Sequence, residues 1–366
     1  MSRNRVIYQS EALYVSKEAH SDTAVLHEQI ERVQSANYSF NISRQDINQY
    51  GHLAKLGSLI LEAPTVSADF TYLATDGFNE RALGFYVQTS ISGASGEASF
   101  ASGQMIETSG RNLFITTVGE GLDNTGVAFG VNTDVIGIGN AYLTDYTLDL
   151  AVGSLPTVSV SYEGANINVS AGTSIINPAV KQDTGLPISG EVLLPTATSG
   201  ESNEIALRPG DVTVDISNFD GITLSDLSGA AEAIHIQSAS LSLPMSRTPL
   251  QRLGTKFSYA RSIDFPVAAT LSINAILNET QVNSLSDVIS TEDDPKTVTL
   301  TLKNPAGGNA LVYTMKGCNL VSESFSSSIG SNKSVDLTFE TQIGGPSDTL
   351  NGVFVSGANI SEVFTA

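Results

Sequence analysis

Apolar and polar residues alternate along several stretches of this 366-residue chain. After Val33, apolar side chains stand at Tyr38, Phe40 and Ile42 with polar residues between them, and the same alternation returns at 66–72. A period of two places every second side chain on one face of a β-strand. Each of these stretches therefore predicts a strand with one buried face.

The rest of the chain continues this pattern. Helical spacing is confined to 76–85, where Phe78, Ala82 and Phe85 share a face, and to 278–289. We therefore predict a mainly β chain with one short helix beside each group of strands. Further strands are predicted at 6–8, 12–15, 59–61, 113–118, 127–131, 135–138, 143–152, 158–162, 191–194, 204–207, 212–216 and 353–355.

One stretch occurs twice. Residues 33–51 align without a gap with 236–254, at an offset of 203 positions and with seven identities. A second block keeps the same order, since 143–163 aligns with 320–340 at an offset of 177 and matches Glu163 to Glu340. One β fold made twice explains both blocks. The seven identities pair Gln34, Ser35, Ala36, Ser39, Ser43, Arg44 and Gly51 with Gln237, Ser238, Ala239, Ser242, Ser246, Arg247 and Gly254.

The two copies differ in length. Their offsets of 203 and 177 differ by 26 residues, so the first copy carries 26 more residues in its loops. Much of this extra length is expected in the Gly-, Ser- and Ala-rich segment 90–110, where contacts to partners are expected. The 70 residues 164–233 match neither repeated block and are too many for a bare linker. The predicted parts are an N-terminal arm (1–32), copy one (33–165), a connector with a small β portion (166–233), copy two (234–345) and a C-terminal tail (346–366).

The composition excludes some classes of function. Asp and Glu outnumber Lys and Arg by 38 to 18, and the net charge of −20 argues against a clamp that grips nucleic-acid phosphates. The same negative charge is compatible with the wall of a channel through which nucleic acid slides without binding. The lone cysteine, Cys318, excludes an intrachain disulfide framework and is expected to be a small buried side chain. No apolar run is long enough for a spanning helix, and no secretory signal is expected, so we predict folding in a cytoplasm.

Candidate chemistry is sparse. The four histidines, at 20, 27, 52 and 235, form no metal-binding pair and no nucleophile motif, so ordinary surface or turn positions are expected for them. The acidic run 292–294 suits either a divalent cation or a solvated turn, although Ca²⁺ loops space their ligands. We predict no enzyme activity, no metal and no cofactor.

The stretches RVQSANYSFNISRQDINQYG and LEAPTVSADFTYLATDGFNERALGF resemble the opening of a major tail tube protein of long-tailed bacteriophages. The resemblance covers 33–86, and more loosely 234–345 through SLPMSRTPLQRLG. It implies a β-sandwich or rolled sheet with a flanking helix, whose strands join those of neighbouring subunits in a β-barrel. It also implies stacked rings that form a tube for DNA delivery.

Partners follow from the resemblance. Family rings are commonly hexamers of single-domain subunits, so two copies on one chain imply a trimer with pseudo-sixfold symmetry, with a hexamer as the alternative. Tape measure and baseplate proteins are the implied neighbours, DNA passes through the lumen without specific binding, and no membrane is involved. The implied location is the virion tail, assembled in the host cytoplasm.

Six twinned residues are the predicted assembly interface: Gln34, Ser43, Arg44, Gln237, Ser246 and Arg247. An arginine at these places either pairs with an acid on the neighbouring copy or is a solvated turn residue. Other assignments stay open: a tandem of β domains with no assembly role, or another virion ring component such as a tail terminator, baseplate hub ring or capsid decoration protein. A carbohydrate-binding β-sandwich is disfavoured because the chain has no Trp and only 7% aromatic residues.

Overall fold

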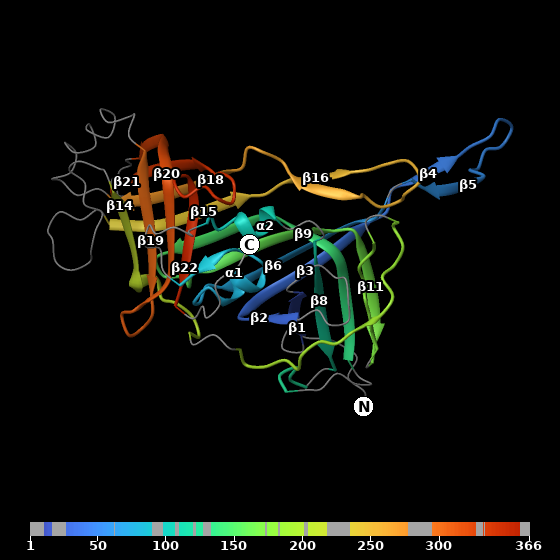
Figure 1. Cartoon of the computed structure of the whole chain (residues 1–366), viewed down its shortest axis with the longest axis horizontal. Helices are drawn as coiled ribbons and strands as arrows, with labels where there is room; N and C mark the ends of the chain where they lie inside the picture. Colours follow the sequence, from blue (N-terminus) through green and yellow to red (C-terminus); the bar gives the residue numbers. More distant parts are fainter. Residues whose placement is uncertain are drawn as a thin grey trace.

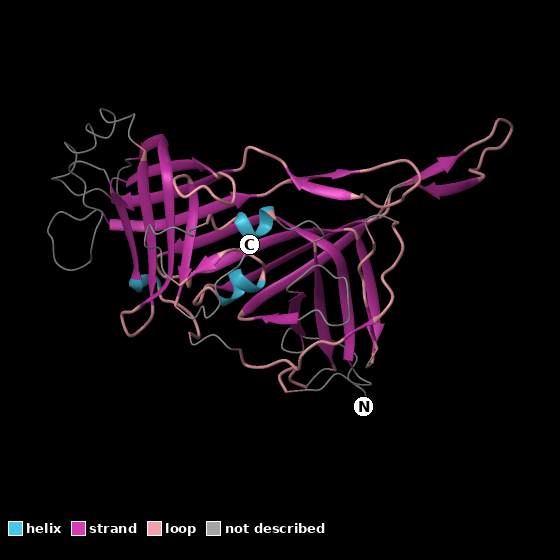
Figure 2. Cartoon of the chain, in the orientation of Figure 1, coloured by secondary structure: helices cyan, strands magenta, loops and turns pink. Residues whose placement is uncertain are grey.

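The computed structural model describes residues 11–358 apart from 17–26, 62, 90–97, 107–109, 120–121, 127–132, 173, 182–183, 201–203, 218–234, 277–294, 327–331 and 333. The described chain is built mostly of β-strands, with short helices between them (Figure 2). The prediction of a mainly β chain is confirmed. The predicted segments 6–8, 127–131, 278–289 and 292–294 lie outside the described residues.

Copy one and its flanks supply the first half of the elements. The predicted helical turn is confirmed as α1 (Phe78–Ala82), which follows the left-handed Gly77. Strand β9 covers two predicted runs in one continuous element. The other elements are β1 (Glu11–Ser16), β2 (His27–Ile30), β3 (Val33–Asn41), β4 (Arg44–Ile47), β5 (Gly57–Ile60), β6 (Thr65–Leu73), β7 (Val87–Gln88), α2 (Ser102–Met105), β8 (Arg111–Val118), β9 (Thr133–Ala151), β10 (Thr157–Gly164) and β11 (Asn166–Ala171).

The connector and copy two supply the second half. Strands β12 and β13 pair only with each other in the described structure, so they are a small β portion of the connector itself. The remaining elements are β12 (Ile175–Ile176), β13 (Glu191–Val192), the 3-10 helix η2 (Pro209–Asp211), β14 (Val212–Ser217), β15 (His235–Pro244), β16 (Arg247–Leu250), β17 (Ala260–Ile263), β18 (Ala268–Ile276), β19 (Lys296–Lys303), β20 (Asn309–Ser326), β21 (Ser334–Gln342) and β22 (Gly352–Gly357).

The two copies have the same strand pairing. In copy one β3 pairs with β6, β6 with β10 and β10 with β9, while in copy two β15 pairs with β18, β18 with β21 and β21 with β20. Irregularities recur at matching places: the register shifts between Val33 and Ser35 and again between Ile236 and Ser238. A bulge inserts a residue at a fixed point of a ladder, so its recurrence at the 203-residue offset extends the duplication from sequence to geometry.

The long strands β9 and β20 turn from one sheet layer into another at matching residues. Asn140 in β9 has φ 50° and Gly317 in β20 has φ 65°, and these positions are 177 residues apart. This left-handed conformation is open to Gly and, among other residues, chiefly to Asn and Asp. Before the left-handed residue, the first half of β9 pairs with β8 and β11, and the first half of β20 pairs with β19 and β22.

Flanking strands complete each copy. Strand β1 pairs with β8, and β14 takes the corresponding place beside β19. Strand β11 of the predicted connector therefore joins copy one, whereas β14 of the connector and β22 of the predicted tail join copy two. Each structural copy therefore includes strands from outside the predicted blocks 33–165 and 234–345. The sequence repeat did not mark these strands, because they lie outside the aligned residues.

One hydrophobic core serves both copies. The apolar faces of the two groups of strands pack into a single cluster that includes Phe100, Tyr146 and Phe339. Phe100 stacks on Phe85 with ring centroids 4.0 Å apart and meets Tyr313 of copy two edge-on. The helices α1 and α2 lie in this central region (Figure 1). Strand β7 of copy one also pairs in parallel with β22, so the two halves are interlocked.

Three sequence expectations are corrected. The described part of 1–32 is no arm, because β1 pairs on both sides, with β2 and β8. The described end of segment 90–110 is packed into the core at Phe100 rather than exposed to partners, because its aromatic ring has a stacking neighbour. No strand forms at 204–207; the carbonyl of Ile205 instead accepts a hydrogen bond from the Arg32 side chain.

Candidate assembly surfaces

The two copies are joined by a pair of strand edges. The second half of β9 pairs antiparallel with β15, so that Leu148 stands opposite Leu241 and Asp149 opposite Ser240. The Ser240 hydroxyl donates to the Asp149 carboxylate over 2.7 Å, across the junction. Copy one thus offers its β9 edge, and copy two accepts it with the strand that corresponds to β3. The chain displays one complete copy-to-copy contact.

The counterparts of these two edges lie at the ends of the same sheet. The strand path runs β20-β21-β18-β15-β9-β10-β6-β3, with four strands from each copy. Within the described residues, β3 pairs only with β6, and residues 319–326 of β20 pair only with β21. Tyr38 and Phe40 on β3 are 43% and 57% exposed. Unpaired backbone donors and acceptors on such an edge are a template for another strand.

One face of this sheet carries mostly polar side chains. The opposite face is buried in the core, so polar residues occupy the alternate positions. Asp69, Asp149 and Asp336 are exposed on the polar face, and partial burial raises the pKa of Asp145. None of the positions on this face holds Lys or Arg. Its polar positions include Ser35, Asn37, Ser39, Asn41, Thr65, Ser67, Asp69, Thr71, Asp145, Thr147, Asp149, Ser159, Ser161, Glu163, Ser238, Ser240, Ser242, Thr270, Ser272, Asn274, Ser322, Ser324, Ser326, Asp336, Thr338 and Glu340.

The hairpin of β16 and β17 lies across copy one (Figure 1). The Arg247 guanidinium is buried, donates to the Gln104 carbonyl over 2.6 Å and lies 4.9 Å from the centre of the Tyr142 ring. Arg261 on the second strand of the hairpin forms an ion pair with Glu163 at 3.0 Å. Both arginines belong to copy two, and these partners belong to copy one. The hairpin therefore fastens the copies together beside the sheet junction.

The matching hairpin of β4 and β5 projects beyond the β3 edge (Figure 1). All four residues of β4 are exposed, Arg44 included. Apolar side chains stand uncovered along it, with Tyr50 104% and Leu53 110% exposed, as in a fully open chain. Exposed apolar residues grouped on one projection are typical of a surface that contacts another molecule.

The six predicted site residues have different surroundings. Ser43 and Arg44 are exposed at the base of the β4–β5 hairpin, and Gln34 bonds to the Arg32 carbonyl. Arg247 lies at the copy-to-copy contact, where it donates to the Gln104 carbonyl and lies over the Tyr142 ring. Arg261, which the aligned identities did not include, forms an ion pair with Glu163 of copy one.

The other two predicted residues accept hydrogen bonds through their backbone carbonyls. The carbonyl of Gln237 accepts one from the Val152 amide of copy one, and the carbonyl of Ser246 accepts one from the Asp264 amide within copy two. Their role in assembly stays a prediction. Sequence reasoning also missed Asp149 and Glu163 at the copy-to-copy contact, and Glu340 at the outer edge of copy two. The match of Glu163 to Glu340 at the 177-residue offset was the signal that pointed to the last two.

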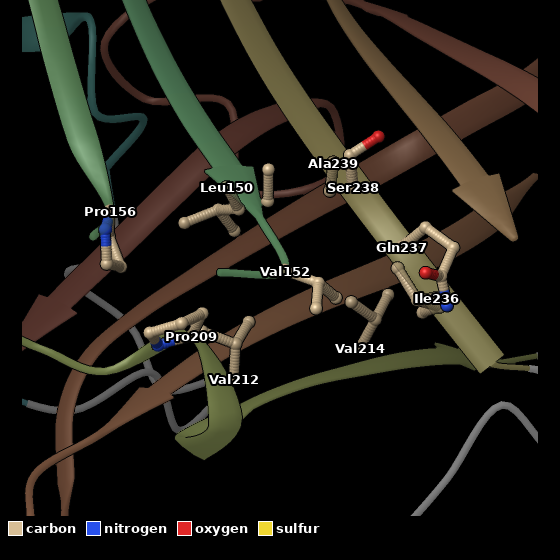
Figure 3. Close-up of a pocket in the computed structure, with 11 residues that line it drawn as sticks. Leu150, Val152, Pro156, Pro209, Val212, Val214, Ile236, Gln237, Ser238 and Ala239 are labelled. Carbon is tan, nitrogen blue, oxygen red and sulfur yellow. The ribbon is translucent and has the colours of Figure 1, made fainter. Parts of the chain in front are cut away.

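A small apolar pocket lies at one end of the β9–β15 junction (Figure 3). Leu150, Val152 and Pro156 approach it from copy one, and Val214 and Ile236 come from β14 and β15. Its volume is about 60 Å³. Ligand pockets usually enclose roughly 300 Å³ or more, so this space is a packing joint between the copies rather than a ligand site.

A larger hollow of about 590 Å³ lies beside the outer edge of copy two. Asn319, Val321 and Glu340 line it, together with residues that follow β21. Asp348, also in the lining, accepts hydrogen bonds from the amides of Leu350 and Asn351, which lower the pKa of its carboxyl group. The hollow thus carries two carboxyl groups.

The Glu80 side chain in α1 is fully buried in the core. Its Oε1 atom accepts from the hydroxyls of Tyr72 at 3.0 Å and Tyr146 at 3.3 Å, while its Oε2 atom has no hydrogen-bond partner. Burial raises the pKa of Glu80 to about 6, against the hydrogen bonds, which lower it. The Cys318 thiol is buried too, as predicted, and burial raises its pKa to about 12.

Among the described residues, no three or more His, Cys, Asp and Glu side chains are grouped to hold a metal ion. No helix in that part of the chain is long and apolar enough to cross a membrane.

No family model matches the chain, and no curated protein matches it in sequence. Among solved structures, a chain from the "tail of empty GTA particle", refined with C6 symmetry, is 13% identical over 37% of this chain and 93% of its own, with a TM-score of 0.25. A chain from the 6-fold symmetrised baseplate of the anti-feeding prophage (AFP) is 13% identical over 45% and 99%, with a TM-score of 0.26. TM-scores of this size establish neither a shared fold nor a shared function.

Proposed function

We propose that this protein is a non-catalytic structural subunit of a bacteriophage tail tube, in which chains join edge to edge into rings that stack around a DNA passage. The observation that carries the proposal is the β9–β15 junction inside the chain. It leaves β20 and β3, the counterparts of β9 and β15, at the two ends of the sheet. The sequence resemblance to tail tube proteins supplies the virion setting.

Head-to-tail contacts of this kind form closed rings when the rotation between units returns to its start, and open filaments when it does not. If β20 meets β3 of the next chain as β9 meets β15, three chains give a ring of six similar copies. Eight strands per chain then make 24 in the barrel. With strands about 4.8 Å apart and tilted by about 40°, such a barrel is roughly 45–50 Å across its backbone, wide enough to stay hollow.

The polar face must line this passage, because the other face is filled by the core. Its hydroxyl and amide groups keep water on the wall, and its acids repel nucleic-acid phosphates over about 8 Å at physiological salt. A wall without Lys or Arg gives DNA no cation to hold. Such a surface suits transit rather than binding, and the tape measure and baseplate proteins remain the proposed tail partners.

The internal junction also predicts the register between chains. Ser242 stands opposite Thr147 in β15 and β9. The offsets of 203 and 177 convert this pair into Ser39 of one chain opposite Ser324 of the next. Both side chains are exposed on the polar face. The contact can therefore be tested with one pair of substitutions.

The test is a Ser39→Cys/Ser324→Cys variant, treated with oxidant or a short thiol crosslinker and run on a non-reducing gel. We expect covalent trimers, because each ring holds three such contacts, and rings or tubes by electron microscopy. Cys318 is buried and does not compete. A Ser39→Cys/Ser272→Cys control places the second thiol in the middle of the sheet and should give monomers. A protein that is monomeric at all concentrations, without crosslinks, contradicts the proposal; isolated rings that never stack favour another virion ring component.

A further inference from the structure

The β16–β17 hairpin of copy two has a defined seat on copy one. Arg247 lies against Tyr142, and Arg261 pairs with Glu163 at 3.0 Å. Phe257, in the loop of the hairpin, reaches the neighbourhood of Gly185 in the connector. The hairpin is thus held by a ring, a carboxylate and a packing contact, all outside its own copy.

The same seat can be located on copy two through the 177-residue offset. Tyr142 and Glu163 become Asn319 and Glu340, which stand opposite each other in β20 and β21 as Tyr142 and Glu163 do in β9 and β10. On copy one this place is covered by the hairpin. On copy two it is the hollow of about 590 Å³ that Asn319, Val321 and Glu340 line.

The chain also carries a hairpin without a seat. The β4–β5 hairpin matches β16–β17 at the 203-residue offset, with Arg44 in the place of Arg247 and Ser58 in the place of Arg261. Its apolar residues are exposed, and it projects from the β3 end of the sheet, whereas Glu340 lies near the β20 end (Figure 1). The hairpin therefore cannot fill the hollow of its own chain.

We propose that the hollow beside Glu340 receives the β4–β5 hairpin of the neighbouring chain, with the Arg44 guanidinium against the Glu340 carboxylate. This inference rests on the proposed ring, because the β20–β3 contact brings the hairpin of one chain over copy two of the next. It adds a second contact outside the sheet, between a basic residue on an apolar projection and an acidic hollow.

The substitutions between the copies fit this assignment. The carboxylate is present in both seats, as Glu163 and Glu340, but its partner Arg261 is replaced by Ser58 in the first hairpin. Arg44 is then the remaining guanidinium at the base of that hairpin. The ring of Tyr142, which holds Arg247 in the internal contact, is replaced by the smaller Asn319. This change leaves room for Arg44 to turn toward Glu340, and a charge-assisted hydrogen bond becomes possible there.

A charge exchange tests the pair. Arg44→Glu and Glu340→Arg should each raise the dissociation constant of the ring by about tenfold, measured by analytical ultracentrifugation, because each places like charges together. The double variant Arg44→Glu/Glu340→Arg should recover at least half of the loss on a logarithmic scale. Lys303→Glu reverses a charge on β19, outside both the hairpin and the hollow, and should leave assembly within about twofold of the unmodified protein.

The outcomes separate the two proposals. If the unmodified protein forms no rings, the proposed function fails. If it forms rings, and the single variants assemble normally or the double variant is as weak as either, the Arg44–Glu340 contact is wrong while the edge contact stands. Crosslinking through Ser39→Cys/Ser324→Cys in the Arg44→Glu background, at high protein concentration, shows that the strand edges of the variant are intact.

Discussion

The hydroxyl oxygens of Tyr146 and Tyr313 lie 2.6 Å apart inside the core, and this hydrogen bond joins copy one to copy two. Because the Tyr146 hydroxyl donates its hydrogen to Glu80, it accepts the hydrogen bond that the Tyr313 hydroxyl donates. The resulting relay from Tyr313 through Tyr146 to Glu80 crosses the boundary between the copies. Burial places the pKa of all three groups above their ordinary values.

Glu80 should make the stability of the chain depend on pH. Burial raises its pKa from 4.5 to about 6. A carboxyl group whose pKa is raised by folding binds its proton more tightly in the folded state, so its stabilising contribution is complete below pH 4.5 and is lost as the pH rises through 6. The loss amounts to about 2 kcal/mol in the free energy of unfolding.

We therefore expect Glu80→Gln to remove this part of the pH dependence. Urea unfolding at several pH values between 4 and 8 measures it, as the difference between the variant and the unmodified protein. That difference should change by about 2 kcal/mol in favour of the variant as the pH rises. Parallel pH profiles for the two proteins would show that Glu80 does not titrate in this window.

Tyr313→Phe should weaken the contact between the copies. The substitution removes the donor to Tyr146 and leaves a buried hydroxyl short of one bond, which costs about 1–3 kcal/mol of unfolding free energy. Thermal and urea unfolding measure the loss. Tyr50→Phe is the control, because Tyr50 is 104% exposed and its hydroxyl is in water. A loss equal in the two variants would argue against the relay.

Replacing acidic residues on the polar face with lysine should make this face bind DNA. Asp69→Lys/Asp336→Lys adds one cation per copy to this face without touching the strand edges. We expect rings or tubes to form as before and to retain duplex DNA, with an affinity that falls steeply with salt. Asp123→Lys/Asp215→Lys makes the same charge change elsewhere. If that control binds DNA as tightly, total charge rather than this face is responsible.

Gly317 should be hard to replace. Its φ is 65°, and a Cβ atom there would overlap the Asn351 Oδ1 atom. Gly317→Ala therefore combines a left-handed residue, which costs roughly 1–2 kcal/mol, with a steric overlap. Gly307→Ala isolates the first effect, because Gly307 has φ 87° with open space around it. Unfolding free energies should fall more for Gly317→Ala; equal losses would mean that Asn351 moves aside.

The sequence by itself determined the strands, the duplication and one helix. Alternation marked which side chain of β6 or β21 is buried, because a strand has a fixed period of two. The two offsets located equivalent residues, and the match holds down to Gly51 and Gly254, both left-handed with φ 84° and 93°. The alignment of Glu163 with Glu340 was also visible in the sequence, although the position of Glu340 beside a hollow was not.

Only the tertiary structure decided which edges meet and which stay open. Backbone hydrogen bonds are alike for every residue, so alternation identifies a strand's buried face but not its neighbour. The β9–β15 pair, the buried Arg247 and the exposed Arg44 follow from contacts between segments that are distant in sequence. The arginines at 44 and 247 thus differ in exposure, because the hairpin of Arg247 packs on copy one of its own chain and the hairpin of Arg44 projects beyond the sheet.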